Sequence, residues 1–165
     1  SGNIAISLAK ELDNCWILAL DVSFEALLLA KKNIQKHKVA ERVHIIYGDL
    51  FLPLKQDLGH FHIIVSKTPY IAEEDWDDLA PEVKEYEPKA ALDGGPQGEG
   101  FLRHIIHEAP DYLLPDGFLL LELGYNHSEA VRFWVKEEPG LAWVSIIPDY
   151  SGTPRVAVIR KIQIG

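Results

Sequence analysis

Apolar positions follow helical spacing at the start of the chain and then form continuous strand-like runs. Three apolar residues share one helical face and predict a first helix: Ile4, Leu8 and Leu12. The apolar run at 16–20, which ends at Asp21, predicts a buried strand. Ser23 then stands where a helix N-cap is expected, before a second helical pattern. The chain therefore begins as helix, strand and helix.

The same alternation continues to the C-terminus. Strands are predicted at 43–47, 61–65 and 118–123, and helices at 102–113 and around 130–134. Two closely spaced strands close the chain, and we expect them to form an antiparallel pair at one sheet edge: 141–147 and 156–162. Alternating strands and helices predict an α/β fold whose mostly parallel sheet carries helices on both faces.

A long connection at 71–98 interrupts this pattern. It is rich in acidic residues and contains Pro and Gly, and it exceeds the usual loop length. Loops of this length in compact domains tend to be binding elements or lids, which is the role we expect here.

Composition narrows the class of protein. The 165 residues suffice for one domain, and 47% hydrophobic with 25% charged residues is ordinary for a soluble globular protein. No apolar run approaches the roughly 20 residues that span a bilayer, and no leader pattern is present. The single cysteine, Cys15, excludes an internal disulfide. We therefore predict a cytoplasmic protein without a membrane partner.

Net charge bears on the partner. The formal charge is −9, and an acidic stretch runs from Glu73 to Glu87. A broad nucleic-acid interface needs a basic face to meet phosphates, so nucleic acid is not the expected partner, although a small local basic patch stays open. His104 and His107 lie one helical turn apart, but no further ligands converge by spacing. We interpret both as exposed helix histidines and predict no metal site.

Polar residues stand where three predicted strands end: Asp21, Asp49 and the turn at 66–70. Ligands bind at the carboxyl ends of strands in parallel sheets. Asp21 has the chemistry to accept hydrogen bonds from both hydroxyls of a ribose, or to cap a helix. Asp49 with the apolar Leu50 and Phe51 suits an adenine ring and its amine, or a simple turn. In Ser1-Gly2-Asn3, a small-residue turn lets backbone N–H groups approach a ligand.

The turn after the third strand is more specific. Pro69 and Tyr70 give a rigid rim with a stacking surface directly behind a buried strand. With these segments the chain resembles the peptide-chain release-factor glutamine methyltransferases. The resemblance covers nearly the whole chain, in the family's order, at 1–5, 21–23, 48–51, 64–71, 86–95, 98–100, 114–117, 121–124 and 149–156.

The resemblance implies a Rossmann-like class I methyltransferase fold and S-adenosylmethionine as cofactor. It assigns the methionine part of the cofactor to Ser1, Gly2 and Asn3, the ribose to the Asp21-Val22 segment, and the adenine to Asp49, Leu50 and Phe51. It implies N5-methylation of a glutamine side-chain amide in a release factor, the expected protein partner. Pro69, Tyr70, Glu87 and Pro88 would shape the substrate side.

Two departures from the family pattern stand out. The chain begins inside the Gly-rich motif, so we interpret residues 1–165 as a methyltransferase catalytic domain without its first strand and without the family's upstream helical domain. The family's Asn-Pro-Pro-Tyr turn is replaced by Lys67, Thr68, Pro69 and Tyr70, which occupy the catalytic positions. A charged lysine donates hydrogen bonds but accepts none, so it cannot take over the asparagine oxygen.

Two other readings follow from these departures. An adenine-specific nucleic-acid methyltransferase would use a similar turn on an exocyclic amine, but the acidic balance and the segment 87–95 disfavour it. A catalytically degenerate domain that binds cofactor or partner without transfer is favoured by Lys67.

Overall fold

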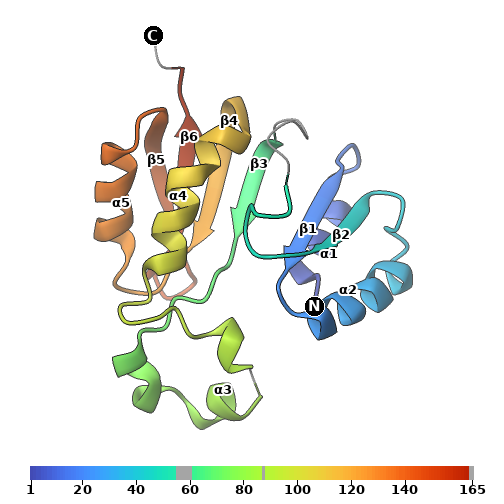
Figure 1. The fold of residues 1–165 in the computed structure, drawn as a ribbon, viewed down its shortest axis with the longest axis horizontal. Coiled ribbons are helices and arrows are strands. Elements are labelled where there is room, and N and C mark those ends of the chain that lie inside the picture. The colour runs from blue at the N-terminus through green and yellow to red at the C-terminus, as the bar shows by residue number, and fades with distance from the viewer. Residues whose placement is uncertain (55–60, 87, 164–165) are drawn as a thin grey trace. The chain divides into compact units, whose positions relative to one another are not determined.

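The computed structural model describes residues 1–54, 61–86 and 88–163. The chain divides into two compact units, Ser1–Leu58 and Gly59–Gly165, and each has its own sheet and helices (Figure 1). No helix in the described ranges is long and apolar enough to cross a bilayer.

The first unit is a helix–strand–helix–strand segment. Its elements are α1 (Asn3–Glu11), β1 (Ile17–Asp21), α2 (Phe24–Lys36) and β2 (Val43–Tyr47). The two strands are parallel, and Asp21 pairs in register with Tyr47 at their carboxyl ends. The predicted N-cap is confirmed, because the Ser23 hydroxyl accepts a hydrogen bond from the Ala26 amide over 3.1 Å.

The helical face predicted for α1 is wrong, although the helix itself is confirmed. Its buried residues are Ala5, Ile6 and Ala9, whereas Ile4 and Leu12 are 41% and 46% exposed. The small alanines let the α1 backbone lie close to the core that Ile34, Val39 and Val43 complete, so the neighbouring face turns outward.

The strand β1 is half-buried along its length, not buried as predicted. In the part of the chain that the structure describes, β1 has a strand partner on one side only, β2. A strand becomes fully buried when strands flank both of its edges and helices cover both of its faces, and the described residues give β1 a strand on one edge only.

The second unit contains a four-stranded mixed sheet. Its strands are β3 (Phe61–Ser66), β4 (Leu113–Glu122), β5 (Leu141–Pro148) and β6 (Pro154–Lys161), in the order β3-β4-β6-β5. The pair β3–β4 is parallel, and β6 is antiparallel to both β4 and β5. The predicted antiparallel pair at the sheet edge is confirmed, and with it the α/β class.

Two helices pack on this sheet, α4 (Gly100–Tyr112) and α5 (Ser128–Glu137). The largest fully buried side chains of the unit come from α4, α5, the two central strands and the residue after β4: Leu102, Ile105, Ile106, Leu113, Leu119, Leu121, Leu123, Val131, Val135 and Ile159. The apolar face predicted for the helix at 102–113 is therefore confirmed.

The long connection predicted at 71–98 contains short helices: η1 (Glu73–Asp78), α3 (Pro81–Tyr86) and η2 (Lys89–Ala91). Its two ends meet, because Ile71 donates its amide to the Leu92 carbonyl and accepts one from Gly94, both over 2.9 Å. The Lys89 ammonium lies 5.1 Å from the centre of the Trp76 ring and 3.7 Å from Asp93. The connection is thus closed at its base and tied across its middle.

Candidate functional site

The first unit brings together the ends of its two parallel strands. The Gly48 amide donates to the Asp21 carbonyl over 3.1 Å, so Asp21 and Gly48-Asp49 are neighbours. One Asp21 carboxylate oxygen accepts the Ser23 amide over 2.9 Å. A carboxylate has two oxygens and several lone pairs, so this hydrogen bond leaves Asp21 able to accept from a ligand as well.

The turn at Ser1-Gly2-Asn3 leads directly into α1. Gly2 has φ +77°, and a Cβ at this position would lie 3.0 Å from the Ala30 Cβ on α2. Both constraints call for glycine. No side chain caps α1, so the amides of its first turn have no side-chain acceptor. A glycine turn at the start of a helix has the backbone geometry to receive an anionic or polar ligand group, and the assignment of the cofactor to Ser1, Gly2 and Asn3 stays a prediction.

The segment predicted to flank the adenine differs in exposure from residue to residue. Asp49 is exposed and Leu50 has φ +43°, whereas Phe51 is buried at 7% exposure. The exposed apolar side chains of this unit include Val22, Phe24, Tyr47 and Leu52. Of these, only Val22 was among the predicted cofactor residues. Phe24 and Tyr47 pack edge to face with ring centres 6.5 Å apart. Which of these side chains would flank an adenine ring stays a prediction.

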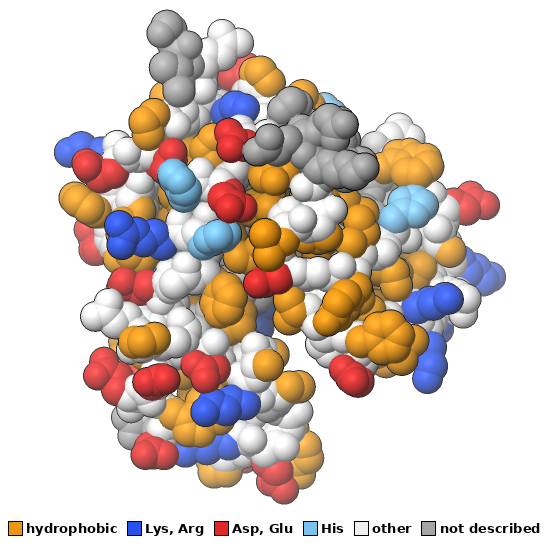
Figure 2. Space-filling view, viewed as in Figure 1, with side chains coloured by type: hydrophobic (Ala, Val, Ile, Leu, Met, Phe, Trp, Pro, Cys, Tyr) orange, Lys and Arg blue, Asp and Glu red, His pale blue; other side chains and the backbone are white. Residues whose placement is uncertain are grey.

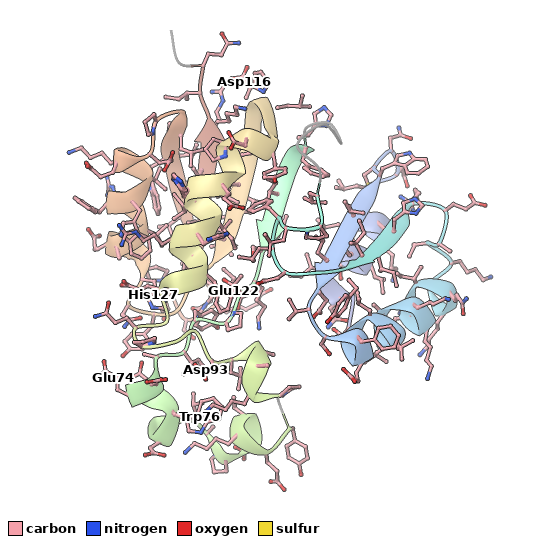
Figure 3. The ribbon with its side chains drawn as sticks, viewed as in Figure 1. Glu74, Trp76, Asp93, Asp116, Glu122 and His127 are labelled. Carbon is pink, nitrogen blue, oxygen red and sulfur yellow. The ribbon has the colours of Figure 1, made fainter. Side chains whose placement is uncertain are left out.

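In the second unit, the Lys67–Tyr70 turn follows β3 and meets the end of β4. The Tyr70 hydroxyl donates to the Glu122 carboxylate over 3.3 Å, and the Lys67 ammonium lies 3.9 Å from the same oxygen. Figure 3 shows Glu122 at the end of β4 beside this turn. One carboxylate oxygen therefore serves both a phenol and a cation.

Burial and the Glu122 charge change the acidity of Tyr70. The pKa of the Tyr70 phenol is raised above its ordinary value, first because the ring is partly buried and then because the Glu122 carboxylate lies beside it. Arg155 acts in the opposite direction. The phenol consequently keeps its proton and acts as a hydrogen-bond donor to Glu122.

Arg155 joins β6 to the end of β4. Its guanidinium donates to the Leu123 carbonyl over 2.8 Å and pairs with Asp149 at 3.1 Å. Asp149 also accepts the amides of Ser151 and Thr153. This network fixes the turn between β5 and β6 against the strand end that carries Glu122.

The loop at 93–98 packs against the backbone of Tyr70. A Cβ at Gly94 would lie 2.9 Å from the Tyr70 Cα, and one at Gly98 would overlap the Tyr70 carbonyl oxygen. His127 closes the other side, with its ring edge to face with Tyr70 at 6.3 Å. In the described ranges, two buried side-chain polar atoms have no partner, Thr68 Oγ1 and His127 Nδ1, and both belong to this region.

Two further residues, Glu87 and Pro88, were predicted on the substrate side. Pro88 is exposed and precedes η2. Glu87 lies outside the described residues. Glu122, His127 and Arg155 were not among the predicted site residues. The position of Glu122 at a strand end is a signal that sequence alone offers, whereas nothing in the sequence indicates the burial of His127.

The two histidines of α4 lie beside carboxylates. His104 lies 3.2 Å from Glu108 and His107 lies 3.0 Å from Glu138, and both rings are exposed as predicted. Within residues 1–54, 61–86 and 88–163, no three metal-ligating side chains gather.

The two units together have an α/β fold, and in each unit polar residues follow the carboxyl ends of parallel strands. A methyltransferase from Pyrococcus furiosus has a similar structure, with a TM-score of 0.67 and 23% identity over 98% of this chain and 70% of that chain. At this identity the likeness concerns the fold.

The family follows from the sequence. Residues 1–84 match the methyltransferase small domain, and the chain belongs to this family. A release factor glutamine methyltransferase of Geobacter sulfurreducens is 45% identical over 131 residues, which cover 79% of this chain and 45% of that protein. The human MTRF1L release factor glutamine methyltransferase is 35% identical over 98% of this chain and 49% of that protein. The chain thus spans about half the length of the curated relatives it matches.

Proposed function

We propose that the protein carrying this chain methylates the N5 nitrogen of a glutamine side chain in a peptide-chain release factor, with S-adenosylmethionine as methyl donor. The observation that carries the proposal is the Lys67–Tyr70 turn, held by Glu122 directly after β3. It stands in a chain that is 45% and 35% identical to two release factor glutamine methyltransferases.

The residues of the first unit suit the cofactor. Asp21 would accept the ribose hydroxyls with the carboxylate lone pairs that its hydrogen bond from the Ser23 amide leaves available. The glycine turn at Gly2 and the uncapped first turn of α1 would receive the methionine part. Asp49, with apolar neighbours, would face the adenine. These assignments support each other because Asp21 and Gly48 are hydrogen-bonded neighbours.

The residues of the second unit would hold and orient the amide. S-adenosylmethionine, when bound, would supply an electrophilic methyl group, and the residues of the turn would hold the glutamine amide nitrogen toward it. Catalysis of this kind rests on positioning. Pro69 and Tyr70 would form the pocket wall, and main-chain carbonyls of the turn would accept the amide N–H groups.

Lys67 supports a second candidate, a domain that binds the cofactor without transferring the methyl group. Its ammonium is directed to Glu122 and offers no acceptor for the substrate amide. Both candidates predict cofactor binding, and only the first predicts transfer.

Isothermal titration with S-adenosylmethionine and a methyl-transfer assay on a release factor test the proposal together. We expect binding and transfer, and a loss of cofactor affinity of about tenfold or more in Asp21→Asn, because one ribose acceptor becomes an amide. Asp13→Asn is the matched control, since Asp13 is an exposed aspartate of the same unit. Binding without transfer would support the second candidate, and no binding would contradict both.

A further inference from the structure

His127 is the most deeply buried polar side chain of the site region, at 2% exposure. It directly precedes α5, where its carbonyl accepts the Val131 amide over 2.9 Å. Figure 3 shows it in the same region as Glu122, and its ring contacts Tyr70 and lies beside Gly98 and Gly124.

The two ring nitrogens of His127 have different surroundings. Nε2 lies 3.3 Å from the Gln97 carbonyl oxygen. A carbonyl only accepts, so Nε2 carries the proton and donates it. Nδ1 is buried and has no hydrogen-bond partner in the described part of the chain. A buried polar atom without a partner costs stability, so packing alone would favour an apolar ring here.

Two glycines make room for the imidazole. A Cβ at Gly124 would lie 2.9 Å from Nδ1 and 3.0 Å from the Tyr70 ring. A Cβ at Gly98 would lie 3.2 Å from the His127 Cε1. The imidazole is therefore wedged between the β4–α5 turn, the loop at 93–98 and the Tyr70 ring.

We propose that His127 is a positioning residue that fixes Tyr70 and the Gln97 segment for substrate binding. Tyr70 is held at its hydroxyl by Glu122 and at its ring by His127. The hydrogen bond to Gln97 couples the same ring to the loop that packs on the Tyr70 backbone. Removing the Nε2 donor frees this loop, and with it the pocket wall. The inference rests on the proposed function and adds a residue to its substrate side.

The test separates the hydrogen bond from the packing of the ring. His127→Phe keeps an aromatic ring without a donor, and His127→Gln keeps an N–H donor. His104→Gln is the matched control on the exposed surface of α4. In the full-length protein that carries this chain, we expect His127→Phe to raise KM for the release factor about 5- to 10-fold. The Kd for S-adenosylmethionine should change less than twofold, and His127→Gln should restore most of the loss.

Hydrogen exchange gives a second readout that needs no activity. The Gly98 amide, bonded to the Gly95 carbonyl at 3.1 Å, should exchange about 5- to 10-fold faster in His127→Phe and near the native rate in His127→Gln. Native exchange in His127→Phe would overturn the inference, even if the protein transfers no methyl group. A glutamine variant as impaired as the phenylalanine variant would also overturn it. Absence of transfer in the unmodified protein, with the exchange pattern as expected, would contradict only the proposed function.

Discussion

At the residue scale, the chemistry of the candidate site centres on one carboxylate. Glu122 accepts the Tyr70 hydroxyl and pairs with Lys67 through the same oxygen. Removing either Tyr70 or Lys67 changes the interaction of Glu122 with the other. The effects of substituting both residues should therefore not be additive. The pair also explains how a cation is tolerated at the position where the resembling family has an asparagine.

Replacing that cation tests whether it limits catalysis. Lys67→Asn supplies a side-chain oxygen that accepts a substrate N–H, and an unmet buried N–H costs about 1 to 3 kcal/mol. We therefore expect methyl transfer to increase by about tenfold or more, with cofactor affinity unchanged. Lys136→Asn, an exposed lysine of α5, serves as control. Unchanged transfer with intact cofactor binding would show that Lys67 is not the obstacle.

The acidity of Tyr70 gives a pH-dependent test of Glu122. Its folded pKa is raised above 10.0, by burial first and then by Glu122, so its contribution to stability is present below pH 10 and lost as pH rises through the folded value. Glu122→Gln removes a negative charge, and the pKa should fall back toward 10.0. Ultraviolet-difference titration measures this, with Tyr70→Phe identifying the step among six tyrosines. A pKa that Glu122→Gln leaves unchanged would contradict the contact.

At the element scale, sequence patterns predicted where strands and helices lie better than which faces they bury. The strand 43–47 and the buried positions of α4 follow from apolar spacing alone. In α1 the same argument selected Ile4 and Leu12, because it weighs hydrophobicity and ignores size. The core selected Ala5 and Ala9, which permit closer packing. Face selection depends on the shape of the partner surface, which the local sequence does not contain.

The candidate site, too, was only partly predictable from the sequence. The sequence predicted that Asp21 ends one strand and that the turn with Tyr70 follows another, and the structure confirms both positions. Their roles at a ligand site stay predictions. The burial of His127 was not predictable, because it depends on Tyr70 and on the loop at 93–98, which are distant in sequence. The loop at 93–98 closes on Tyr70 through backbone contacts that no side-chain pattern reveals.

This loop predicts a large difference between two nearby glycines. Gly98→Ala places a Cβ against the Tyr70 carbonyl at φ +69° and should lower stability by about 1 to 3 kcal/mol. At the exposed start of α4, Gly100→Ala has no neighbour closer than 4.0 Å and should be neutral or stabilising by up to about 1 kcal/mol. Thermal unfolding of both variants measures the difference. Equal unfolding temperatures would contradict the close packing of this loop.

At the scale of the whole molecule, charge is unevenly distributed. Figure 2 shows carboxylates on the connection between β3 and α4, where the sequence places Glu73, Glu74 and Asp75 at the start of η1. The lysines of this connection are engaged internally, Lys84 with Asp77 and Lys89 with Trp76 and Asp93. The connection therefore presents mainly negative charge to a partner.

This charge separates a protein substrate from a nucleic-acid substrate. Affinity for nucleic acid comes largely from cations that displace counterions at phosphates, and the chain carries a net charge of −9. We expect no binding of single-stranded DNA or RNA oligonucleotides in fluorescence anisotropy at about 150 mM salt. A variant with Glu73, Glu74 and Asp75 changed to lysine should gain weak, strongly salt-dependent binding, because it creates the missing cationic patch. Tight binding by the unmodified protein, weakening steeply with salt, would instead favour an adenine-specific nucleic-acid methyltransferase, since it would require a local basic surface that outweighs the acidic connection.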